Sequence, residues 1–204
     1  MKEKEKKMYT LLLLLIYLAF ISLGLPDSLL GSAWPVTHKA FQVPLSYAGL
    51  VTMIISGGTI CSSLMSERLT KKFGTQIVTV FSVMLTAIAL FGFSTASAFW
   101  MLCLWAVPYG LGAGAIDAAL NNYVALHYNS RHMSWLHCFW GLGTIISPYV
   151  MSYALTTSVW QNGYRMVSFI QIGITLILFV TLPIWKVNKK ETAQEEKAEE
   201  EMVG

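Results

Sequence analysis

Two acidic residues lie inside long apolar stretches of this sequence, where an ionised side chain is costly. Asp27 and Asp117 are the only carboxylates away from the charged ends and the short loops. An ionised carboxylate facing lipid would cost at least about 2.5 kcal/mol. No Lys or Arg lies deep in these stretches, so we expect a water-filled cavity around both acids. A carboxyl group removed from bulk water can take up and release protons near neutral pH, which predicts proton coupling at both positions.

The helix that carries Asp27 is expected to break close to this residue. Gly24, Pro26 and Gly31 interrupt the first apolar stretch near its outer end. Irregular backbone at membrane depth usually lines a cavity, although a simple packing kink is an alternative. The structural alternative for the two acids also stays open. Asp27 would then cap the broken helix, and Asp117 would be a permanently hydrogen-bonded acid.

Three further polar or aromatic residues are predicted to contact a solute. Asn121 lies four residues after Asp117, which places both on one helix face. His137 and Trp140 lie three residues apart on the next apolar stretch. A sugar ring could stack on Trp140 while the carboxyl, amide and imidazole groups hold its hydroxyls. Simple core or interface packing is the alternative for His137 and Trp140.

The elements that must position these residues are membrane-spanning helices. Of the 204 residues, 55% are hydrophobic and 12% are charged, and the charges gather at the ends and in short loops. A helix needs about 20 mainly apolar residues to cross a bilayer. The sequence therefore predicts an all-α integral membrane bundle of six transmembrane helices. We place them near 8–34, 44–66, 76–95, 98–126, 133–156 and 164–185.

The distribution of Lys and Arg predicts the orientation of this bundle. These residues lie almost entirely on alternate loops, together with the two ends, and such loops stay in the cytoplasm. We therefore expect a multi-pass protein of the cell membrane with both termini cytoplasmic. Residues 1–186 form the transmembrane domain and 187–204 a charged cytoplasmic tail or linker. The net charge of +3 then reflects topology, so we expect contact with membrane lipid and none with nucleic acid.

The fourth and fifth predicted helices resemble those of one transporter family. The segment GLGAGAIDAALNNYVALHYNSRHMSWLHCFWGLGTIISP combines a glycine run, an acid four residues before an asparagine, a short basic turn and a polar, aromatic stripe. It is similar to the amino-terminal six-helix half of transporters in the fucose-permease-like branch of the major facilitator superfamily. The resemblance implies proton-coupled sugar transport, with Asp117 and Asp27 in proton coupling. Trp140 replaces a polar group of that branch, so the sugar need not be fucose.

The loop between the second and third helices resembles the superfamily's latch between its two halves. That loop usually reads Asp-Arg-x-Gly followed by basic residues. Here SERLTKKFGT keeps the glycine and the basic character, but a lysine stands where the Asp is expected. The resemblance implies an altered latch made of Glu67, Arg68, Lys71, Lys72 and Gly74.

The resemblance covers one half of a two-half transporter, and it requires a second half. Such transporters rock two six-helix halves around a midplane site. We therefore expect this chain to pair with another six-helix chain, to form a homodimer, or to be an incomplete gene product. The alternative function is a non-transporting membrane subunit or an inactive truncated remnant. An enzyme is not expected, and neither a cofactor nor a metal, because the sequence shows no defensible catalytic triad, paired metal ligands or phosphate loop.

Overall fold

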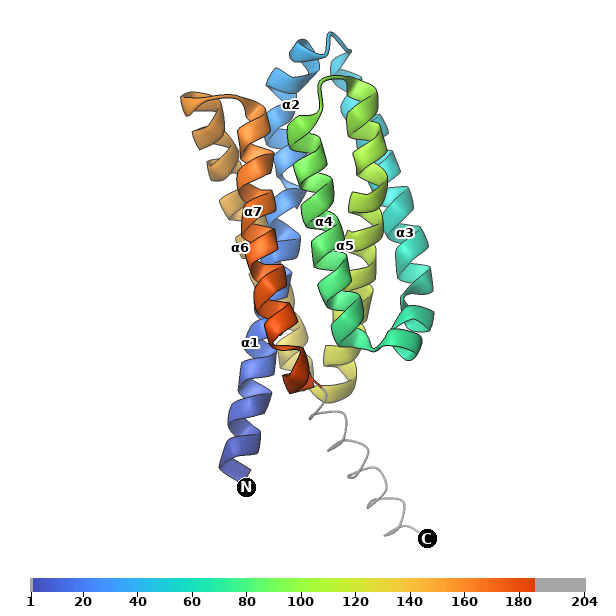
Figure 1. Ribbon diagram of the computed structural model, residues 1–204, viewed down its shortest axis with the longest axis vertical. Coiled ribbons are helices and arrows are strands. Elements are labelled where there is room, and N and C mark those ends of the chain that lie inside the picture. The colour runs from blue at the N-terminus through green and yellow to red at the C-terminus, as the bar shows by residue number, and fades with distance from the viewer. Residues whose placement is uncertain (1, 186–204) are drawn as a thin grey trace.

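Helices make up all the regular structure that the computed structural model describes, which covers residues 2–185 (Figure 1). A one-residue turn at Ser28 separates the first two helices, and Gly74 alone separates two others. In chain order the elements are α1 (Lys2–Asp27), α2 (Leu29–Ala40), the 3-10 helix η1 (Leu45–Tyr47), α3 (Ala48–Phe73), α4 (Thr75–Thr95), α5 (Phe99–His127), α6 (Ser130–Thr157) and α7 (Trp160–Val180).

The prediction of six membrane-spanning helices is confirmed. Six segments among the described residues are long and apolar enough to cross a bilayer. They are Lys7–Ala40, Leu45–Phe73, Thr75–Thr95, Phe99–His127, Ser130–Thr157 and Trp160–Val180. The cytoplasmic location of the termini stays a prediction, and the predicted tail 187–204 lies outside the described residues.

The first span ends later than predicted, and the last one is interrupted by a turn before its predicted end. The first span runs through α2 to Ala40 instead of ending near 34, because backbone hydrogen bonds continue up to Phe41. α7 ends at Val180, where the chain turns at Thr181, and a short helical stretch at 182–185 then reaches the predicted end near 185. The Thr181 N–H donates to the Ile177 carbonyl at this turn, and Pro183 lies in the first turn of the short stretch, where its missing N–H costs no helical hydrogen bond.

The helices pack as neighbouring pairs around one opening. α3 packs along α5, α5 along α4, α4 along α7, and α1 along α6, which also contacts α7. The backbones of α1 and α3 do not approach each other closely, and those of α1 and α5 do so only over a short stretch. The first helix begins and α7 ends at the same end of the bundle (Figure 1). The opening between α1, α3, α5 and α6 is where the polar residues gather.

Glycines set how closely the helices approach on both sides of this opening. A Cβ atom added at Gly110 on α5 would collide with the Ile55 carbonyl of α3, and one at Gly114 with the Thr59 carbonyl. On the other side, Gly143 of α6 faces the backbone of α1 in the same way. Small residues let backbones meet in lipid, where packing and weak hydrogen bonds hold helices together. The close packing of α5 against α3 therefore depends on the missing side chains of Gly110 and Gly114.

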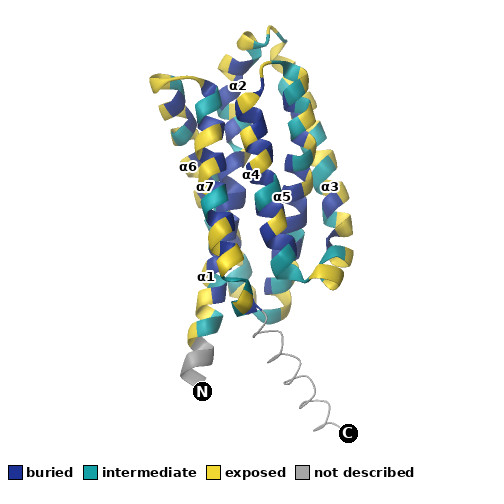
Figure 2. Ribbon diagram, viewed as in Figure 1, coloured by how far each residue is buried: buried dark blue, intermediate teal, exposed yellow. Residues whose placement is uncertain are grey.

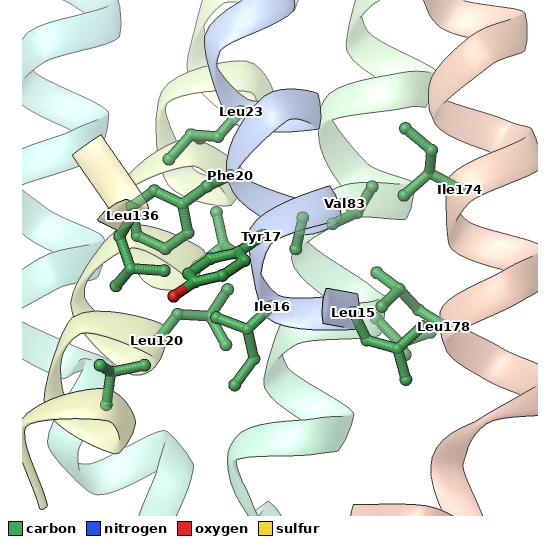
Figure 3. Packing of buried hydrophobic residues seen from close by; sticks show 14 of the residues in the cluster. Leu15, Ile16, Tyr17, Phe20, Leu23, Val83, Leu120, Leu136, Ile174 and Leu178 are labelled. Carbon is green, nitrogen blue, oxygen red and sulfur yellow. The ribbon is translucent and has the colours of Figure 1, made fainter. Parts of the chain in front are cut away.

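One apolar core cluster lies among α1, α4, α5, α6 and α7, and a second of similar size also includes residues of α2 and α3. Side chains of α1 such as Leu15 and Phe20 contact α4, α6 and α7 in the first cluster (Figure 3). The spans of α3 and α6 are the least buried (Figure 2). Within the most apolar 18 residues of each span, 11% are buried in α3 and 22% in α6, against 44% or more in the other four spans. The bundle is therefore well packed inside but leaves two helices largely uncovered.

Candidate functional site

Asp27 lies at the break between α1 and α2, as the sequence predicts. It is the last residue of α1, directly after Pro26. Proline has no N–H, so the Ser22 carbonyl four residues earlier loses its usual backbone donor. The Gln171 side chain of α7 donates to that carbonyl at 2.7 Å, with both residues buried. The interruption is thus stabilised from a neighbouring helix, and it places the Asp27 side chain at the edge of the opening.

Two side chains from other helices hold the Asp27 carboxylate. The Tyr109 hydroxyl of α5 donates to Oδ1 at 2.9 Å, and the Trp140 indole N–H of α6 donates to Oδ2 at 2.8 Å. No side-chain hydrogen bond caps the start of α2. Asp27 therefore does not act as the helix cap that the structural alternative required. It links three helices instead.

Asp117 lies on the same cavity, further along α5. Its Oδ1 accepts a hydrogen bond from the Asn121 side-chain N–H at 3.0 Å. The predicted one-turn spacing thus brings these two residues into direct contact. The other amide atom, Asn121 Oδ1, is buried and has no hydrogen-bond partner among the described residues. Asn121 contacts the acid but does not line the cavity, so it holds Asp117 in this structure.

One cavity brings together four of the five residues that were predicted to act on protons or solute. It has a volume of about 310 Å³ and lies between α1, α3, α5 and α6. Its lining consists of Leu23, Asp27, Ile55, Thr59, Tyr109, Ala113, Asp117, His137 and Trp140. The volume is at the lower end of the range for pockets that hold small organic ligands. Whether these residues act on protons or solute stays a prediction.

The chemistry of the lining is that of a mildly acidic, partly aromatic site. It offers two carboxyl groups, one imidazole, one phenol and one indole, and neither Lys nor Arg contributes to it among the described residues. The His137 ring meets the edge of Phe20, with ring centroids 6.2 Å apart. Such a lining can hydrogen-bond hydroxyl groups of a solute and can exchange protons at more than one position.

Tyr109 is the cavity residue that the sequence interpretation missed. It lies eight residues before Asp117, with Ala113 between them, and all three line the cavity. This spacing puts them on one face of α5, two helical turns long. The signal was available in the sequence. Tyrosine is also common at membrane interfaces, however, so this residue type by itself does not indicate a cavity.

A second cavity begins on the other side of Asp27. It has a volume of about 200 Å³ and is largely apolar, with a lining that includes Asp27, Tyr109, Thr52, Phe93 and Tyr164. Asp27 and Tyr109 therefore line both cavities. The hydrogen bond between them thus joins two residues that both cavities share.

The predicted latch residues lie at the far end of α3, at the loop to α4. Lys71 Nζ and Glu67 Oε1 form an ion pair at 2.6 Å, one helical turn apart, and both side chains are exposed. Lys72 lies 5.2 Å from the centre of the Phe73 ring. Gly74 has a φ of 85°, in the region that favours glycine, and it ends α3 and precedes α4. Arg68 is exposed beside them. Their role as a latch stays a prediction.

The sequence matches one protein superfamily and is similar to two curated proteins at low identity. Residues 16–203 match the Major Facilitator Superfamily. The chain is 22% identical over 182 residues to the glucose/mannose transporter GlcP of Bacillus subtilis, covering 87% of this chain and 44% of that protein. It is 23% identical over 163 residues to Bypass of stop codon protein 6 of Saccharomyces cerevisiae, covering 78% and 33% respectively.

A solved structure shows the same arrangement of helices. The chain superposes on a crystal structure of a mutant peptide transporter POT in complex with sulfate, with a TM-score of 0.67 and 16% sequence identity. The match covers 97% of this chain and 44% of that one. The chain thus spans less than half the length of each of these proteins.

Proposed function

Because this chain belongs to the major facilitator superfamily, we propose that it forms one half of a proton-coupled transporter for a small polar solute. Asp27 and Asp117 exchange protons with water in the cavity, and His137 and Trp140 contact the solute, while Asn121 holds Asp117. The second wall of the cavity comes from another six-helix half. The two halves move against each other to open the site to each side of the membrane in turn.

The observation that carries this proposal is the shared cavity. Two carboxyl groups from α1 and α5 and two ring side chains from α6 converge on one space, although the sequence separates them widely. Ionisable residues within membrane spans usually face such spaces and mark ion or substrate pathways. A purely structural role for both acids would not require a cavity of this size beside them.

A sugar is the solute class that the lining and one relative support. Hydroxyl groups can bond to the carboxyl and imidazole groups, and an exposed indole face can cover a sugar ring. The Trp140 side chain is 38% exposed, so part of its surface is available to a solute. The name of the relative GlcP states transport of glucose and mannose, at 22% identity. We expect a hexose or a closely related sugar.

The test of proton coupling is the Asp117→Asn substitution. Membrane vesicles containing the chain and any second half should accumulate radiolabelled glucose or mannose when a proton gradient is imposed. Asp117→Asn keeps the hydrogen bond to Asn121 possible but removes the exchangeable carboxyl proton, so gradient-driven accumulation should fall at least about tenfold. Exchange of labelled for unlabelled sugar without a gradient should survive.

The matched control is Asp117→Glu, which keeps the carboxyl group and should retain part of the gradient-driven accumulation. Folding of each variant is checked by gel filtration in detergent. If Asp117→Asn accumulates sugar as well as the unchanged chain does, Asp117 has no part in proton coupling.

A second candidate is a non-transporting membrane subunit, which the largely uncovered apolar faces of α3 and α6 favour, since another protein can cover them. A reading frame for a second six-helix half next to this one would favour the transporter. If the unchanged chain takes up no sugar and associates stably with a protein of another family, the subunit is favoured.

A further inference from the structure

The two groups that hold Asp27 differ in what they can do when the carboxyl group binds a proton. Trp140 Nε1 carries a hydrogen and has no lone pair, so it can only donate. The Tyr109 hydroxyl can donate and can also accept. In the structure both donate, one to each oxygen of Asp27. This arrangement suits the ionised carboxylate, which only accepts.

Each carboxyl oxygen has two lone-pair positions, and on each oxygen one of them already accepts a hydrogen bond. A proton placed at that position on Oδ2 would point at the indole N–H, which cannot accept it. A proton placed at that position on Oδ1 would point at the Tyr109 oxygen, which can accept it once the hydrogen bond between them reverses. The tyrosine hydrogen would then turn away from Asp27, and the second cavity, about 200 Å³ in volume and also lined by Tyr109, gives it room. Trp140 would continue to donate to Oδ2 in both states.

We propose that Tyr109 is the positioning residue that allows Asp27 to bind and release a proton without leaving its place between α1, α5 and α6. Its hydroxyl donates to the ionised carboxylate and accepts from the protonated acid. The inference deepens the proposed proton coupling at Asp27 and rests on it for its role in transport. The reversal of the hydrogen bond itself can be measured without transport.

The other titratable groups around Asp27 do not replace this function. Asp117 on α5 and His137 on α6 line the same cavity, and Tyr164 of α7 lines the second one. Neither α3 nor α4 contributes a titratable residue to these two linings. Only Tyr109 and Trp140 form hydrogen bonds to Asp27 among the described residues. Tyr109 is also 4% exposed, so it has little access to bulk water as a substitute partner.

Tyr164 provides a matched control for Tyr109. It is a buried tyrosine that lines the second cavity, like Tyr109, and its ring packs against Phe93, as the Tyr109 ring does. Its hydroxyl forms no hydrogen bond to Asp27. Changing either tyrosine to phenylalanine removes one oxygen atom and keeps the ring. Only the change at Tyr109 removes a partner of the carboxyl group.

The test uses infrared difference spectra of the purified full chain in lipid bilayers, titrated from about pH 4 to about pH 10. Asp27→Asn identifies the carboxyl band of Asp27, and Tyr109→Phe identifies the phenol C–O band of Tyr109. The frequency of a phenol C–O stretch depends on whether the hydroxyl donates or accepts. We expect the Tyr109 band to change from the donor to the acceptor position at the pH where the Asp27 band titrates. Asp27→Asn should abolish that change, and Tyr164→Phe should leave it intact.

Two results would overturn the inference. One is a Tyr109 band that stays unchanged while Asp27 titrates, and the other is an Asp27 band that does not titrate in this range. Uptake measurements separate this failure from failure of the transport proposal. Coupled bands in a chain that transports no sugar would leave the hydrogen-bond reversal standing and remove the transporter. Proton-driven uptake in a chain whose Tyr109 and Asp27 bands change independently would leave the transport proposal standing and overturn the hydrogen-bond reversal. If both proposals hold, Tyr109→Phe should lower proton-driven uptake about tenfold or more, and Tyr164→Phe should not.

Discussion

Trp140 has two proposed functions that depend on different parts of one side chain. Its ring face is available to a solute, while its N–H donates to Asp27. The sequence indicated only the first function, because a tryptophan beside polar residues predicts stacking. The hydrogen bond shows that the same residue also touches a group proposed to carry protons. Solute binding and proton binding therefore meet at a single side chain.

Trp140→Phe should separate these two functions. Phenylalanine keeps a flat apolar surface but removes the N–H, so sugar affinity should fall only a few-fold. The pH dependence of uptake should shift upward by about one unit, because the N–H bonds the ionised carboxylate about 1–1.5 kcal/mol more strongly than it bonds the neutral acid. Uptake measured across pH at several sugar concentrations checks both values. Trp140→Ala, which removes the ring as well, should also weaken sugar binding. An unshifted pH profile in Trp140→Phe would show that the N–H is unimportant for proton binding.

At the scale of the helix, the break in α1 depends on a hydrogen bond from α7. Pro26 leaves the Ser22 carbonyl without its backbone donor, and the Gln171 side chain supplies a replacement. A buried carbonyl with no donor would cost about 1–3 kcal/mol. Through this contact Gln171 of α7 binds the neighbouring helix α1. Its function is to allow the irregular backbone that places Asp27.

Gln171→Leu should destabilise the bundle by about 1–3 kcal/mol, because the Ser22 carbonyl loses its donor. In Pro26→Ala the backbone N–H can supply the bond itself, so adding Gln171→Leu to that background should cost clearly less. Unfolding in mixed detergent micelles, followed by circular dichroism, gives the four free energies of this double-mutant cycle. Equal costs of Gln171→Leu in both backgrounds would mean that the proline does not create the need for the side chain.

At the scale of the whole molecule, the bundle leaves the two helices beside the cavity uncovered. Apolar residues of α3 and α6 such as Leu64 and Tyr149 are 79% and 74% exposed. Lipid can cover apolar side chains, but it cannot close a polar cavity, since hydrocarbon offers no hydrogen bonds to the carboxyl groups. A second protein wall over this opening is therefore the expected arrangement. The exposed basic residues at the end of α3 are suited to contact it.

Native mass spectrometry in a mild detergent should show this chain associated with a second six-helix chain or with a copy of itself. The chain alone has a mass of 22.7 kDa. Tyr149→Arg should weaken the association if α6 forms the interface, because a charge would then face an apolar surface. The same substitution at Phe179, an exposed residue of α7, serves as the control. A particle that always has the mass of one chain would contradict the two-half arrangement.

The sequence by itself determined the membrane class, the six spans and the two acids that a bilayer would not tolerate without water. These follow from local properties, because span length and the cost of a buried charge depend on residue type and spacing alone. The one-turn spacing of Asp117 and Asn121 likewise predicted their contact, which lies within one helix. The end of the first span at Ala40 and the turn at Thr181 were not predicted, because hydrogen bonding continues or stops independently of hydropathy.

Only the tertiary structure decided which residues share the cavity. The Asp27 bonds to Tyr109 and Trp140 join residues 82 and 113 positions apart, on helices whose rotation and depth are fixed by packing. Close approach at glycines such as Gly110 and Gly143 sets those positions, and it depends on both partners at once. A pattern within one helix contains no information about the face that a distant helix presents. For this reason Tyr109 became recognisable as a partner of Asp27 only in the folded chain.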